Sequence, residues 1–161
     1  MLYGHGSKER QQRGPPTAEG KSEVSSVRVR CYQCQGCNAI VRAVPSTVCY
    51  RRLYSAPAIG LAFVLWGILG ASVAEVRAVV SPWKISGSSA PTRWPTLRRW
   101  AQAVREQTLF ACVRRCPDHF TLKKVAERAA ATLAGLGPPT LRSWESLHLS
   151  PIVTHNAQST T

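Results

Sequence analysis

The residues of this 161-residue chain with the most distinctive chemistry are its six cysteines, four of which lie close together. Cys34 and Cys37 have the Cys-x-x-Cys spacing, which lets two thiolates at a turn bind one tetrahedral zinc ion from one side. Cys31 and Cys49 are the candidates for the remaining two ligands. A second Cys-x-x-Cys upstream would complete the site more simply, but residues 1–30 contain none. Zinc bound by these cysteines is one expectation, and a segment without metal is the alternative.

A second candidate site is the arginine-rich stretch at residues 93–110, RWPTLRRWAQAVREQTLF. Leu97, Trp100, Ala101 and Val104 recur at helical spacing, which predicts a helix over residues 97–109 with one buried face. The side chains that could project from the other faces toward a ligand are those of Arg93, Thr96, Arg98, Arg99, Gln102 and Arg105.

These polar side chains are of the types that contact DNA. Arginine pairs with phosphate or guanine, glutamine pairs with adenine, and threonine can donate to phosphate. Thr96 is expected to be the N-cap, and the first half of the helix would enter the major groove of double-stranded DNA. The alternative interpretation is an ordinary basic helix face in contact with water.

The composition favours an anionic partner and argues against catalysis. There are 21 lysines and arginines against 8 acidic residues, a net charge of +13 that favours nucleic acid or an anionic membrane surface. Asp118 is the only aspartate, so the carboxylate cluster of a metal-dependent nuclease or transposase core is not expected. No serine or cysteine has an identifiable base partner, and we expect neither enzymatic activity nor a small-molecule substrate. The N-terminus lacks the apolar segment of a signal peptide, which predicts the cytoplasm.

The two ends of the chain differ in amino-acid composition from its middle. Residues 1–23 and 135–161 are rich in polar residues, glycine and proline, and are expected to be disordered. Residues 24–50 alternate apolar and polar side chains, which predicts a small cysteine-bearing β-hairpin with its turn at Gln35–Gly36.

Residues 56–74 carry no charge and have the hydropathy of a membrane-spanning segment. However, Ser72 and Glu75 have the spacing of a capping box, which marks a helix start inside the run. We therefore expect two helices, at residues 57–69 and 73–80. The first would be about 20 Å long, too short for a hydrocarbon core about 30 Å thick.

The expected fold is mainly α. Residues 51–134 would form a small bundle of the helix-turn-helix type, ending in a helix over residues 122–134 with Thr121 or Asp118 as its cap. The zinc-ribbon-like β segment at residues 24–50 would precede it, between disordered termini.

Several segments between residues 27 and 134 resemble a family of bacterial transposase-like helix-turn-helix proteins with an N-terminal zinc-ribbon-like segment. The segments that carry this resemblance are YQCQGCNAIVRAVP, RRLYSAPAIGLAFVLW, GASVAEVRAVVSPWKISG and RWPTLRRWAQAVREQTLF. The resemblance implies DNA binding rather than strand transfer, and it places Thr96–Trp100 at the start of the recognition helix. A homodimer or a separate recombinase would be the protein partner. The alternatives are a membrane-associated protein that uses residues 56–74, and a mobile-element fragment without retained function.

Overall fold

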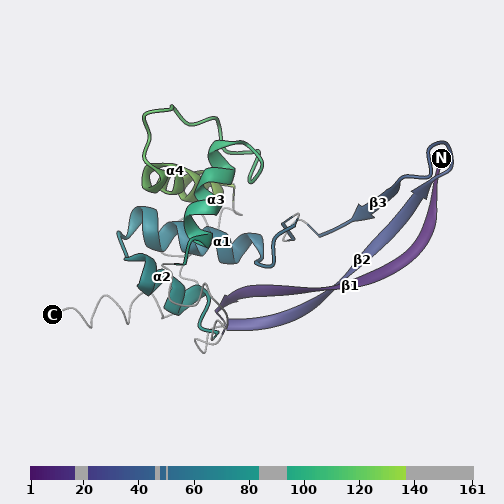
Figure 1. The fold of residues 1–161 in the computed structure, drawn as a ribbon, viewed down its shortest axis with the longest axis horizontal. Helices are drawn as coiled ribbons and strands as arrows, with labels where there is room; N and C mark the ends of the chain where they lie inside the picture. Colours follow the sequence, from purple (N-terminus) through teal and green to yellow (C-terminus); the bar gives the residue numbers. More distant parts are fainter. Residues whose placement is uncertain (17–21, 46–47, 50, 84–93, 137–161) are drawn as a thin grey trace.

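The fold combines a long β-sheet with a helical body (Figure 1). The computed structural model describes residues 1–16, 22–45, 48–49, 51–83 and 94–136. Its elements are β1 (Leu2–Pro16), β2 (Ser22–Cys34), β3 (Ile40–Ala43), α1 (Ala56–Phe63), the π-helical segment η1 (Val64–Ile68), α2 (Val73–Val80), α3 (Thr96–Arg105) and α4 (Leu122–Gly135). Strands make up 30% of the structure and helices 38%, so the expectation of a mainly α fold is wrong.

The three strands form an antiparallel sheet in the order β1-β2-β3. β1 and β2 pair along almost their whole length and extend away from the helices as a ribbon, with the N-terminus at the far end (Figure 1). The expected disorder of the first 23 residues is therefore wrong for residues 2–16, which lie in β1, and for residues 22–23, which lie in β2. These residues have little apolar surface, and their order comes from backbone pairing with β2. β3 joins β2 through a turn at residues 35–37, which includes the predicted Gln35–Gly36 turn.

Arg13 attaches the ribbon to the helical body. Its backbone N–H donates to the carbonyl oxygen of Leu53 over 2.8 Å, and its own carbonyl accepts from the N–H of Ser55 over 2.9 Å. Its guanidinium carbon lies 4.5 Å from the ring centroid of Trp83 and 5.5 Å from that of Tyr54. Because backbone and side chain both bind the body, this end of the ribbon is firmly attached.

The uncharged residues 56–74 divide between two helical segments, as the capping signals in the sequence predict. α1 begins after Ser55, whose hydroxyl accepts from the N–H of Ala58, and the helix continues through η1. Gly70 then adopts a left-handed φ of +75°, which ends the segment. The predicted capping box is present, with Ser72 and Glu75 each accepting from the other's backbone N–H. Among the described residues, no helix is long and apolar enough to cross a membrane.

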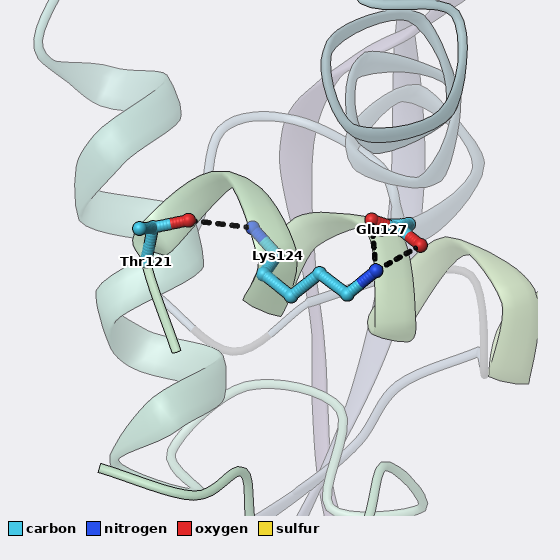
Figure 2. Close-up of polar contacts among 3 residues, drawn as sticks. All are labelled: Thr121, Lys124 and Glu127. Atoms are coloured by element: carbon cyan, nitrogen blue, oxygen red, sulfur yellow. Dashed lines mark hydrogen bonds and ion pairs between the residues drawn. The ribbon is translucent and has the colours of Figure 1, made fainter. Parts of the chain in front are cut away.

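The core lies where α1, η1, α3 and α4 meet. Gly67 of η1 allows α4 to approach closely, because a Cβ built there would lie 2.5 Å from the backbone nitrogen of Glu127. Thr121 caps α4 by accepting from the N–H of Lys124 over 3.3 Å, one of the two caps expected from the sequence (Figure 2). The ammonium of Lys124 lies 2.7 Å from the carboxylate of Glu127 in the same helix. Of the C-terminal segment that we expected to be disordered, residues 137–161 lie outside the described part of the chain.

Candidate nucleic-acid interface

Helix α3 is fixed to the body through the apolar face that the sequence predicts. Leu97, Trp100, Ala101 and Val104 are all buried, with at most 2% of their surface exposed. The ring of Trp100 meets that of Tyr54 edge-on, with 5.0 Å between the centroids. Since α3 also packs against α4, its orientation relative to the body is determined by core contacts.

The opposite face of α3 is positively charged and exposed to solvent. Arg98 and Arg99 are exposed, and neither guanidinium forms a hydrogen bond or ion pair with another described residue. The helical spacing of 100° per residue places Gln102 on the same face. Its side-chain Nε2 donates to the carboxylate of Glu106 over 2.8 Å. Two guanidinium groups without a partner among the described residues thus lie on the same face as the Gln102 amide, which its hydrogen bond to Glu106 orients.

The other predicted contact residues have different surroundings. Thr96 is the first residue of α3, and the N-cap is Pro95, so the expected capping role of Thr96 is wrong. The guanidinium of Arg105 donates to the carbonyl of Phe120, and its Nε is buried without a partner in the described structure. Arg105 therefore connects α3 to the segment before α4. Arg93 lies outside the described residues.

Of the four cysteines considered for zinc, the structure brings two together. Cys34 ends β2 and Cys37 lies in the following turn. Hydrogen bonds from the backbone N–H groups of Cys37 and Gly36, and from the Cys37 thiol, hold the pKa of Cys34 below its ordinary value. This thiol therefore ionises more readily than a free cysteine.

Cys31 and Cys49 do not join this pair to form a four-ligand site. Successive residues of β2 point to opposite sides of the sheet, so Cys31 and Cys34 face opposite ways. Cys49 is half-buried, and its desolvation raises the pKa of its thiol. Within the described ranges, no group of three or more His, Cys, Asp or Glu side chains could hold a metal ion. The described structure therefore does not gather the four cysteines into one site, and zinc at Cys34 and Cys37 stays a prediction.

Sequence reasoning missed a second basic surface, on the sheet. A hollow of about 710 Å³ is lined by Lys8, Glu9, Arg10, Val29, Ile40, Arg42, Val44 and Arg51. Its basic residues come from β1, β3 and the segment after β3. The only sequence signal was the local density of charge, because strand pairing brings together residues that are far apart in the chain.

Comparisons with protein-family models, curated proteins and solved structures found no match to this chain.

Proposed function

We propose that this protein binds double-stranded DNA through α3, as a transposase-like helix-turn-helix protein without a catalytic core. The observation that carries the proposal is the exposure of Arg98 and Arg99 on a helix whose opposite face is buried. A helix attached in this way can enter the major groove, which is about 12 Å wide, without disturbing the core. We place the protein in the cytoplasm, where it would act as a homodimer or beside a separate recombinase.

Electrostatics provides most of the proposed affinity. Arg98 and Arg99 can approach phosphates and release the counterions condensed on DNA. Because no described carboxylate pairs with either side chain, neither must break an ion pair before it binds. The net charge of +13 attracts the duplex before α3 docks.

Base recognition would come from the same face. Either arginine can donate two hydrogen bonds to O6 and N7 of guanine, and Gln102 can pair with adenine. Gln102 must first give up its hydrogen bond to Glu106. The proposal includes no metal-dependent step, and zinc at Cys34 and Cys37 stays a prediction.

A titration of fluorescein-labelled duplex DNA, followed by fluorescence anisotropy, tests the proposal. Arg98→Ala with Arg99→Ala should weaken binding about tenfold or more, since hydrogen bonds to charged groups are stronger than neutral ones. The matched control is Arg114→Ala with Arg115→Ala, which removes the same charge from another exposed arginine pair. Equal losses in the two variants would indicate diffuse charge attraction and contradict a docked α3.

A further inference from the structure

The hollow on the sheet has an apolar floor between basic flanks. The strand register pairs Lys8 of β1 with Val29 of β2, and Cys31 of β2 with Arg42 of β3. Lys8, Val29 and Arg42 consequently lie on one face of the sheet. Adjacent strands are about 4.8 Å apart, so the two basic side chains stand on flanks about 10 Å apart across β2. Val29 is 4% exposed and forms part of the floor with Ile40 and Val44.

Arg10 shapes one wall of the hollow. Its guanidinium donates to the carbonyl oxygen of Cys49 over 3.0 Å and also to that of Arg52. These bonds hold the segment that follows β3 beside the sheet. They go to neutral carbonyl groups, and no carboxylate of the described residues pairs with Arg10.

The one acidic residue of the lining turns its carboxylate away. Glu9 pairs with Arg28, and its carboxylate accepts from the hydroxyl of Ser26, both on the other face of the ribbon from Lys8. Neither the Lys8 ammonium nor the Arg42 guanidinium forms an ion pair or hydrogen bond with a residue in the described ranges. Lys8, Arg10 and Arg42 thus gather positive charge over an apolar floor, and none of the three pairs with a carboxylate among the described residues.

We propose that this hollow binds a nucleotide unit, with its phosphate held between Lys8, Arg10 and Arg42 and its sugar or base against Val29, Ile40 and Val44. Amine and guanidinium groups are the side chains that recognise phosphate, and an apolar floor suits the rest of a nucleotide. The volume of about 710 Å³ is within the range of small-molecule sites. The unit can belong to a nucleic-acid strand or to a free nucleotide. No α3 residue takes part, so the site can exist whether or not α3 binds DNA.

The experiment compares the wild-type protein with a double variant that carries both Lys8→Ala and Arg42→Ala. The Arg114→Ala, Arg115→Ala variant is the control for charge. The double variant Lys8→Arg with Arg42→Lys keeps the charge, and circular dichroism checks that the sheet of each variant is retained. Arg10 stays unchanged because its hydrogen bonds support the wall. The probes are fluorescein-labelled single-stranded DNA, fluorescein-labelled duplex DNA and labelled ADP, each followed by anisotropy.

We expect the Lys8→Ala, Arg42→Ala variant to bind at least one probe about tenfold more weakly, while the charge-keeping variant and the control stay close to wild type. A loss confined to DNA identifies a strand as the ligand, and a loss that includes ADP identifies a free nucleotide. Unchanged binding of all three probes overturns the proposal. Competition by polyglutamate as effective as that by unlabelled nucleotide also overturns it, because the site would then bind acidic peptides. If Arg98→Ala with Arg99→Ala has no effect while this variant does, the α3 proposal fails and the sheet proposal stands.

Discussion

Replacing Gly67 by alanine tests whether α4 rests directly on η1. The new Cβ would lie 2.5 Å from the nitrogen of Glu127, 2.7 Å from its Cα and 3.0 Å from the carbonyl carbon of Ala126. Comfortable contacts between such atoms are about 3.5–4.0 Å, so the two helices must separate by about 1 Å. All three neighbours are backbone atoms, and no change of rotamer can relieve the clash.

The magnitude follows from two opposing contributions. Overpacking of a core costs about 1–3 kcal/mol, and a clash between backbones belongs in the upper half of that range. Alanine recovers about 1 kcal/mol through its higher helix propensity. The expected net loss in the free energy of unfolding is about 1–2 kcal/mol, which corresponds to a fall in Tm of roughly 2–8 °C for a chain of this length.

Gly60 of α1 provides the matched control. A Cβ there meets only the Cδ1 of Leu133, at an ordinary contact distance of 3.8 Å. Gly60→Ala should therefore raise the free energy of unfolding by up to about 1 kcal/mol. Thermal and urea denaturation followed by circular dichroism would measure both variants. A Gly67→Ala protein as stable as wild type, or a Gly60→Ala protein destabilised as much as Gly67→Ala, would refute the close approach of η1 and α4.

Two further predictions concern side chains at the start of α2 and in the sheet segment. Ser72→Ala should lower the free energy of unfolding by about 1 kcal/mol near neutral pH, measured by urea denaturation, because it removes half of the capping box. The backbone N–H of Ser72, with its hydroxyl, lowers the pKa of Glu75, so the half of the box that the Glu75 carboxylate supplies is complete above the ordinary pKa of a carboxyl group and is lost as the pH falls through the lowered value. The penalty of Glu75→Ala should therefore shrink at low pH, and a Glu75→Ala penalty independent of pH would argue against the box. Cys34, with its lowered pKa, should be alkylated by iodoacetamide at a lower pH than Cys49, whose pKa is raised by burial. Peptide mass spectrometry in the presence of EDTA measures which of the two cysteines is alkylated at the lower pH. Alkylation of Cys49 at a lower pH than Cys34 would contradict the hydrogen bonding at the turn.

Local sequence signals predicted the positions of the helices and the turn between β2 and β3, but they missed β1. The helix expected over residues 97–109 is shorter than predicted, because α3 ends at Arg105. The capping box predicted α2 at the residues where it lies, because Ser72 and Glu75 are only three residues apart and form the capping bonds with each other. The buried face of α3 was predictable from the spacing of Leu97, Trp100 and Val104, since helical periodicity reports which side chains leave water.

β1 gave no comparable signal, since most of its side chains stay exposed and its hydrogen-bond partners lie in β2 and not within β1 itself. Its order depends on backbone hydrogen bonds to β2, which composition does not encode, and on the contacts of Arg13 with Tyr54 and Trp83. The hollow was missed for the same reason, because Lys8 and Arg42 approach each other only through strand pairing. Exposure of Arg98 and Arg99 was predictable, but the use of Arg105 to contact Phe120 requires the tertiary fold.

The most direct test of DNA binding by α3 is the salt dependence of duplex affinity. The logarithm of the binding constant falls with the logarithm of salt concentration with a slope of about −0.9 per phosphate contact. If Arg98 and Arg99 each contact a phosphate, their joint replacement by alanine should make the slope less steep by about 1.8. The Arg114→Ala, Arg115→Ala control should leave it unchanged. A slope that is the same in wild type and in the Arg98→Ala, Arg99→Ala variant, with equal affinities, would contradict DNA binding through α3.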